Sequence, residues 1–334
     1  MKISLKTKTI FLLAVFCLLF VTAEDADAAK RKISIGSGVS TGGWFSIGGG
    51  MANGITRYSE HFEATCEGSA AALENFRNLA AGNVELAMSQ PDTAWDYYMG
   101  INNYAGAGNP NLRALWSMFT SVNHTIVLGE SPYRNIQDLI GKKIAVGAPA
   151  SGNEVVARRY LEAQGITYDK IDEQFISSAQ MMTALKDGQI DAIKPTFNVP
   201  NGTITDLALS RSIRFIGSTP EEMERFLSTN KGYFAYTLKA GTYKGQDEDV
   251  LDPGFRGIVF TDRTLFTDDE VYEIVKAVWE SRDECWKDIH VQCSEITLDQ
   301  EFQGWPVPLH MGAYRYYKEK GLDIPEHLIP PEAK

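Results

Sequence analysis

Two short turns rich in glycine and serine contain the residues of this sequence best suited to binding chemistry. The first turn covers residues 36–43 and precedes a helical pattern that starts at Trp44. The second covers residues 147–153 and precedes a helical pattern that starts at Glu154. A helix N-terminus presents unpaired N–H groups and the positive end of a dipole, and glycine lets a ligand approach the backbone closely. The two turns therefore predict a small anion that is held from two sides.

The composition is that of a globular protein with an acidic surface. The 334 residues are 44% hydrophobic and 22% charged, and the formal net charge is −11. This charge argues against nucleic acid and against an anionic membrane surface as partners. It does not exclude an anionic ligand, because local backbone dipoles decide that.

The N-terminus has the pattern of a secretory signal. Three lysines, at positions 2, 6 and 8, precede an apolar run of 12 residues, Ile10–Val21, which is too short to span a bilayer as a helix. We expect residues 1–28 to be a cleaved signal peptide and the mature chain to be a soluble periplasmic protein. An uncleaved anchor is the alternative.

Three cysteines remain after cleavage at that point: Cys66, Cys285 and Cys293. In one unbroken helix the Cα atoms of Cys285 and Cys293 would lie about 12 Å apart, beyond disulfide reach. A disulfide between them therefore requires a chain reversal between residues 288 and 292, and both outcomes are open. Neither these cysteines with His290 nor the acidic run 246–249 has the spacing typical of a metal site.

Strand-like and helix-like segments alternate along the chain, which predicts an α/β fold with parallel sheets. A helix, a glycine and a short strand occur in that order at residues 75–87 and again at 182–192, so two similar lobes are expected. We assign residues 29–121 to the first part of lobe I and 122–238 to lobe II. Residues 239–334 form a return crossing, centred on 239–254, and a helical C-terminal part of lobe I.

Enzyme motifs are incomplete in this sequence. In the glycine-rich run from Gly36, the third glycine of a dinucleotide fingerprint comes one position late, at Gly42. Ser151 lacks the flanking glycines of a nucleophile elbow, and no Ser-His-Asp set can be assembled. We therefore expect a protein that is not an enzyme and has no cofactor or metal.

Polar residues that follow predicted strands complete the candidate site. Gln90 and Asp92 follow one strand, and residues 197–200 follow another, at the strand ends where ligands of α/β folds bind. Asp92 is equally well explained as a helix N-cap. Lys194 could supply a cation to a carboxylate, with a surface lysine as the alternative.

These residues, in this order, resemble the solute-binding subunits of TRAP transporters of the TAXI type over roughly residues 32–320. The most specific stretches are 240–250 and 306–310. The resemblance implies a two-lobed periplasmic binding-protein fold, type II-like, that closes on one solute and delivers it to an ion-gradient-driven permease without ATP. Family ligands include glutamate, glutamine and 2-oxoglutarate. The family's Thr-Gly-Gly-Ser turn aligns with residues 69–72, where alanine replaces both glycines and the serine, so a different or smaller acid is an alternative.

We therefore predict a monomeric extracytoplasmic protein that captures a small organic anion or amino acid. A ligand sensor for a receptor kinase is the main alternative, and a periplasmic enzyme on the same fold is a further one. The predicted ligand-binding residues lie on both lobes and are Ser40, Thr41, Gly42, Gly43, Ser69, Ala70, Ala71, Ala72, Asn75, Gln90, Asp92, Ser151, Gly152, Asn153, Phe197, Asn198, Val199, Pro200 and Tyr243.

Overall fold

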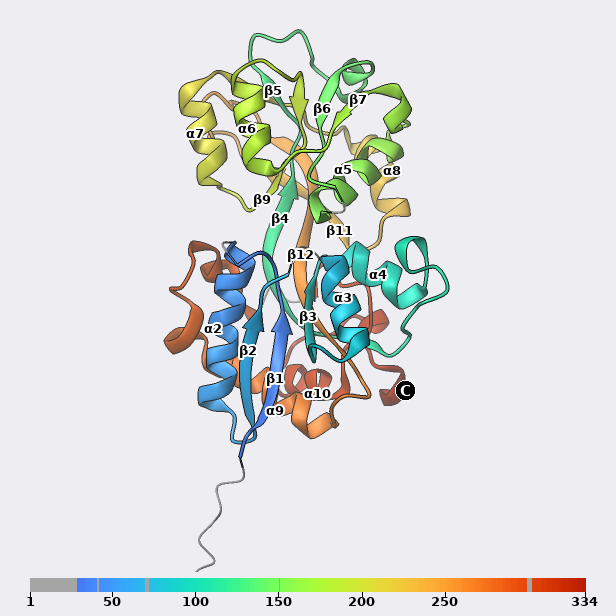
Figure 1. Cartoon of the computed structure of the whole chain (residues 1–334), viewed down its shortest axis with the longest axis vertical. Coiled ribbons are helices and arrows are strands. Elements are labelled where there is room, and N and C mark those ends of the chain that lie inside the picture. The colour runs from blue at the N-terminus through green and yellow to red at the C-terminus, as the bar shows by residue number, and fades with distance from the viewer. Residues whose placement is uncertain (1–28, 41, 70–71, 150, 299–301) are drawn as a thin grey trace, which may run out of the picture.

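The computed structural model describes residues 29–40, 42–69, 72–149, 151–298 and 302–334. The predicted signal peptide, residues 1–28, lies outside these residues. The described chain forms two lobes, each with its own sheet and helices, and two long strands run from one lobe into the other (Figure 1).

Lobe I, the lower body in Figure 1, is built on a sheet of order β2-β1-β3-β12-β4. Its strands are β1 (Arg31–Gly36), β2 (Phe62–Glu67), β3 (Leu86–Ser89), β4 (Leu112–Asn123) and β12 (Val250–Asp262). Its helices are α2 (Gly43–Tyr58), α3 (Ala72–Ala81), α4 (Pro91–Met99), α9 (Asp268–Glu280) and α10 (Met311–Glu319). The C-terminal end of the chain also lies in this lobe.

Lobe II, the upper body, has a second sheet of order β10-β5-β8-β6-β7. Its strands are β5 (Ile126–Leu128), β6 (Lys143–Ala145), β7 (Asp172–Gln174), β8 (Ala192–Ile193) and β10 (Ile213–Phe215). Its helices are α5 (Gly152–Ala163), α6 (Ser178–Lys186), α7 (Gly202–Ser210) and α8 (Pro220–Thr229). The short helical turns of the chain are η1 (Asn102–Tyr104), η2 (Ile136–Leu139), η3 (Tyr168–Lys170), η4 (Arg282–Trp286), η5 (Val291–Glu295), η7 (Glu326–Leu328) and η8 (Pro331–Ala333).

The connection between the lobes is made by β4 and β12, which pair antiparallel from Leu112 opposite Asp262 to Val122 opposite Gly254. At the lobe II end, β9 (Thr196–Phe197) pairs with the end of β4, and β11 (Tyr233–Leu238) pairs with the start of β12. The two crossing strands are thus hydrogen-bonded to each other, and this pairing restricts the orientation of one lobe relative to the other.

Local sequence signals begin and end the helices. Ser177, Thr219 and Thr267 form capping boxes at the starts of α6, α8 and α9, which satisfy N–H groups that the helix leaves unpaired. Gly82 and Gly188 follow α3 and α6 with φ of 72° and 68°, the left-handed conformation that ends many helices. These two glycines are the ones from which the repeated helix–glycine–strand unit was predicted.

The predicted α/β class with two lobes is confirmed, and three details were wrong. Both sheets are mixed, because β12 runs antiparallel to β3 and β4, and β5 runs antiparallel to β8. Residues 239–249 form a loop, closed by an ion pair of 2.8 Å between Lys239 and Asp249, so only the part of 239–254 from Val250 onward crosses between the lobes. In the tail, residues 302–310 are not helical. The exact lobe boundaries stay a prediction.

The C-terminal part packs on lobe I against a face of α2 that is rich in glycine. A Cβ atom on Gly50 would lie 2.7 Å from Cβ of Trp286, and one on Gly54 would lie 2.1 Å from Oγ of Ser281. A Cβ atom on the neighbouring Gly49 would meet nothing within 4 Å. The close approach of the tail therefore depends on particular glycines of α2 rather than on all of them.

This difference can be tested with two alanine substitutions in the same helix. Gly49→Ala should raise the unfolding free energy by about 0.5–1 kcal/mol, because alanine is the better helix former and the site has room. Gly50→Ala should lower it by about 1–2 kcal/mol, because the added methyl group overpacks against Trp286. Urea unfolding of both variants measures this, and an equal effect of the two would contradict the packing described.

Candidate functional site

A cavity of about 210 Å³ lies between the two lobes. Most of its wall comes from lobe I, with smaller contributions from lobe II and from the crossing strand β12. The lining residues are Ser37, Gly38, Trp44, Ala72, Asn75, Met88, Gln90, Ser121, Gly152, Asn153, Thr196 and Phe255. Five of the predicted binding residues, Ala72, Asn75, Gln90, Gly152 and Asn153, are thus brought together here.

Two helices begin at this cavity, and two more begin beside it. Its lining includes Ala72 and Gly152, the first residues of α3 and α5, with Trp44 of α2 and Gln90, the residue before α4. The N-cap and first residue of α2, Gly42 and Gly43, do not line the cavity, and α4 begins with Pro91, which has no N–H group. None of the described lining residues carries a charged side chain. The positive ends of helix dipoles therefore set the electrostatic character of the cavity, which favours a negatively charged group.

Asn75 presents a hydrogen-bond acceptor from lobe I. Its Nδ2 donates to the carbonyl oxygens of Ser37, at 2.6 Å, and of Met88, at 2.8 Å. The amide orientation follows from these bonds, because only the nitrogen can donate to a carbonyl. Oδ1 of Asn75 and Oγ of Ser37 are both buried and have no hydrogen-bond partner among the described residues. Buried polar atoms of this kind usually have a partner, so a ligand group is a natural one.

Asn153 presents a matching acceptor from lobe II. Its Nδ2 donates to the carbonyl oxygens of Val146, at 2.8 Å, and of Lys194, at 3.0 Å. Its Oδ1 is buried without a partner in the described part of the chain. The cavity is thus lined from both lobes by an asparagine whose amide oxygen is buried without a partner among the described residues.

Apolar side chains complete the wall. Trp44 packs edge-on against Phe119 with ring centres 5.6 Å apart. It also covers Gly257 of β12, where a Cβ atom would lie 2.3 Å from the indole ring. The glycine is therefore needed for Trp44 to occupy this position beside the crossing strand.

The two lobes also touch each other directly around the cavity. Nε2 of Gln90 donates to the carbonyl oxygen of Gly152 across a distance of 3.3 Å. Farther along the same helices, Arg159 of α5 reaches Asp92 and Asp96 of α4, and its Nε lies 3.4 Å from Oδ2 of Asp92. Asp92 is fully buried and also accepts a hydrogen bond of 2.8 Å from the hydroxyl of Tyr233. Burial alone lowers the pKa of Arg159, but Asp92 and the other neighbours outweigh it, so the pKa is raised.

Residues 35–321 match the model of the NMT1-like family. The chain belongs to the NMT1-like family. Three solved structures share parts of its architecture at low sequence identity. A protein of Bordetella bronchiseptica RB50 has 14% identity and a TM-score of 0.50, with 91% of this chain and 86% of that chain covered. The periplasmic aliphatic sulphonate-binding protein SsuA of Escherichia coli has 13% identity and a TM-score of 0.48, with coverages of 87% and 79%. A TctC solute-binding protein from Polaromonas has 11% identity and a TM-score of 0.49, with coverages of 88% and 99%.

Several predicted residues of this NMT1-like protein lie away from the cavity. Tyr243 is packed in lobe II, where its ring stacks on Phe215 with centres 5.3 Å apart and its hydroxyl accepts from the backbone N–H of Asn201 at 2.9 Å. Phe197 and Val199 pack against the same apolar cluster. Asp92 binds Arg159 and Tyr233 instead of facing the cavity.

The remaining predicted residues have structural roles or lie outside the description. Ser151 caps α5 by accepting from the N–H of Glu154 at 3.2 Å, and Ser69 donates to the carbonyl oxygen of Ser37 at 2.7 Å. Asn198 donates to the carbonyl oxygen of Pro200 at 3.0 Å. Other residues near the start of α2 are Ser40, Gly42 and Gly43, which do not line the cavity. Thr41, Ala70 and Ala71 lie outside the described residues.

Sequence reasoning missed several lining residues. Ser37 and Gly38 lie in the first glycine-rich turn, and Ser121 lies at the predicted boundary between lobe I and lobe II, but none of the three was predicted to bind a ligand. No sequence pattern marked Trp44 and Phe255 as lining residues, because large aromatic residues usually belong to the hydrophobic core.

The candidate disulfide is absent, since Cys285 and Cys293 are free thiols in the described structure. Cys285 lies in η4 and its sulfur accepts from Arg57 at 3.3 Å, whereas Cys293 lies in the separate turn η5. The chain does leave the helix between the two cysteines, but their side chains lie in separate helical turns, η4 and η5.

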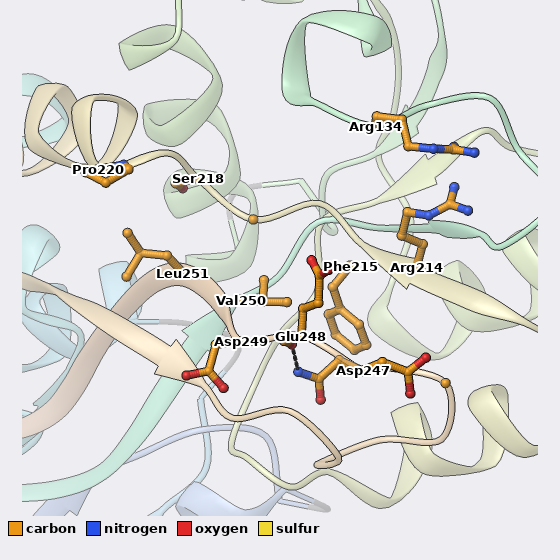
Figure 2. Close-up of a pocket in the computed structure, with 13 residues that line it drawn as sticks. Arg134, Arg214, Phe215, Ser218, Pro220, Asp247, Glu248, Asp249, Val250 and Leu251 are labelled. Carbon is orange, nitrogen blue, oxygen red and sulfur yellow. Dashed lines mark hydrogen bonds between the residues drawn. The ribbon is translucent and has the colours of Figure 1, made fainter.

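A second hollow, of about 640 Å³, lies on lobe II away from the cavity (Figure 2). Arg134 and Arg214 lie on one side of it, and the acidic loop with Asp247 and Glu248 lies on the other. Both arginines donate to backbone carbonyls, among them that of Ser131, and so support the fold. Among the described residues, no group of His, Cys, Asp and Glu side chains is arranged to hold a metal ion. No helix in that part of the chain has the length and apolar character needed to cross a membrane.

The contact between α4 and α5 can be tested by comparing two neighbouring arginines. Arg159→Met should lower the unfolding free energy by about 3–5 kcal/mol, because it leaves Asp92 and Asp96 buried without their cation. Arg158→Met is the control, since this side chain is 34% exposed and pairs only with Glu154 and Glu162 of its own helix. Its loss should cost about 0–1 kcal/mol. Equal losses in urea unfolding would show that the buried pair does not join the lobes as described.

Proposed function

We propose that this protein is an extracytoplasmic solute-binding protein that captures a small carboxylate between its lobes and delivers it to an ion-gradient-driven TRAP permease. The resemblance of residues 32–320 to TAXI-type subunits supports the transport role. The two-lobed fold with a cavity between the lobes supports the capture of a solute.

The observation that carries this proposal is the convergence of helix N-termini on an uncharged cavity. An anion there would be held by backbone N–H groups of α3 and α5, without a charged side chain from the described lining residues. Helix N-termini bind carboxylates in this way because their N–H groups are unpaired and their dipoles point favourably.

The two amide oxygens refine the class of ligand. Oδ1 of Asn75 and Oδ1 of Asn153 have no partner among the described residues and can only accept hydrogen bonds. A ligand that carries N–H donors as well as a carboxylate, such as L-glutamate or L-glutamine, could donate hydrogen bonds to these oxygens in both lobes. An acid without such a donor, such as 2-oxoglutarate, leaves these acceptors unpaired at a cost of about 1–3 kcal/mol each.

Capture requires that the ligand bind the closed arrangement of the lobes better than an open one. A ligand that contacts Asn75 of lobe I and Asn153 of lobe II at the same time would do so, because these contacts join the two lobes. Delivery then follows when a permease favours the open arrangement.

The first test is thermal unfolding of the mature protein against a panel of small carboxylates and amino acids. A ligand at 100 times its dissociation constant adds about 2.7 kcal/mol to the unfolding free energy, which raises Tm by about 4 °C for a protein of this size. We expect the largest shift with an amino acid and a smaller one with 2-oxoglutarate. Absence of any shift across the panel, with ligand-free protein prepared by unfolding and refolding, would contradict the proposed ligand class.

The second test compares two asparagines of lobe II. Asn153→Ala should weaken binding of the panel's best ligand by about tenfold or more, because one hydrogen bond and the support of a cavity wall are lost. Asn198→Ala is the control, since Asn198 is a predicted site residue that does not line the cavity. Calorimetric titration measures both affinities, and a larger loss for Asn198→Ala would place the site elsewhere.

A further inference from the structure

Lys194 is fully buried, and its backbone adjoins the cavity. It follows β8, and its carbonyl oxygen accepts from Nδ2 of Asn153, which lines the cavity. Two residues farther along the chain, Thr196 lines the cavity itself. The backbone of Lys194 is thus part of the support of the binding site, although its side chain points into the protein.

The amino group of Lys194 has few partners for a buried cation. Its Nζ donates to Oγ1 of Thr125 at 2.9 Å and lies 3.9 Å from the ring centre of Tyr160. An ammonium group has three N–H donors, and the described contacts give it one hydrogen-bond acceptor and one aromatic face. Taking such a charge out of water is expensive, so the neutral amine and the ammonium are close in free energy.

The titratable groups that surround this amine come from three elements. They are Tyr160 on α5, Asp252 on β12 and His124 just after β4. Oδ2 of Asp252 lies 2.7 Å from Nδ1 of His124, and both residues are almost wholly buried. Burial lowers the pKa of Lys194 to about 7, and the negative charge of Asp252 opposes that effect only in part. Burial raises the pKa of Tyr160, which stays neutral.

We propose that Lys194 determines the preference of the site for anions: when a carboxylate enters the cavity, its negative charge draws a proton from solvent onto the Lys194 amine. This inference rests on the proposed function, since it takes the cavity as the binding site. The proton balance is simple, because the lone pair of Nζ accepts one proton from water or buffer and no other group changes. Charges interact over longer distances in a protein interior than in water, so the ammonium can act without touching the ligand.

The affinity for an anion then depends on pH in a defined direction. Binding takes up a proton, so affinity should fall as the pH rises above about 7, by up to tenfold per pH unit. Lys194→Met removes the titrating amine and keeps a long side chain, so its affinity should be weaker at about pH 6.5 and nearly independent of pH.

The experiment is calorimetric titration of the protein with L-glutamate at about pH 7.5, in two buffers of different ionisation enthalpy. We expect the wild type to take up about half a proton or more per ligand bound, the Lys194→Met variant to take up none, and Lys186→Met to match the wild type. Lys186 is the control because it is an exposed lysine of the same lobe. Binding without proton uptake by the wild type overturns this inference and leaves the proposed function intact.

A ligand-free measurement makes the inference independent of the choice of ligand. A buried lysine whose pKa is lowered binds fewer protons in the folded state than in the unfolded state, so its destabilising effect is largest below about pH 7 and fades as the pH rises toward 10. The unfolding free energy of the wild type should therefore rise relative to that of Lys194→Met between about pH 7 and 9. Parallel curves for the two proteins overturn the inference, whereas failure of L-glutamate to bind at any pH counts against the proposed function alone.

Discussion

The antiparallel pairing of β4 with β12 is the constraint on which the rest of the structure depends. The two strands cross between the lobes side by side, and their backbone hydrogen bonds run from Leu112 opposite Asp262 to Val122 opposite Gly254. Because both crossings belong to one ladder, the lobes cannot separate without bending this ribbon. The ribbon also brings Ser121 and Phe255 to the cavity, so the hinge and the binding surface are one element.

The cavity illustrates how an acidic protein can still suit an anionic ligand. The chain carries a formal net charge of −11, and the described cavity lining carries no charged side chain. Helix N-termini supply the local field, and Lys194 lies behind the wall rather than in it.

Local patterns predicted much of lobe I and part of the site. The apolar run of β4 and the helix–glycine–strand units were visible because each depends on neighbours in sequence. The strand β12 was missed, since Pro253, Gly254 and Gly257 suggest a loop, and pairing with β4 and β11 overrides that preference. Asn153 was predicted as part of the second glycine- and serine-rich turn, and Asn75 lies near the start of α3. Tyr243 could not be placed, because its position depends on stacking against Phe215 of lobe II, a contact between residues far apart in the sequence.

The contact of Arg159 with Asp92 and Asp96 has a consequence for resting behaviour. It joins helices from different lobes and needs no ligand, so it biases the protein toward closure. Each 1.4 kcal/mol of such bias, roughly, changes the ratio of closed to open molecules tenfold. Under the proposed function, a solute that enters through the open form then finds fewer open molecules. Arg159 would therefore set a compromise between how fast a solute is captured and how long it is retained, and substitutions there would change the two in opposite directions.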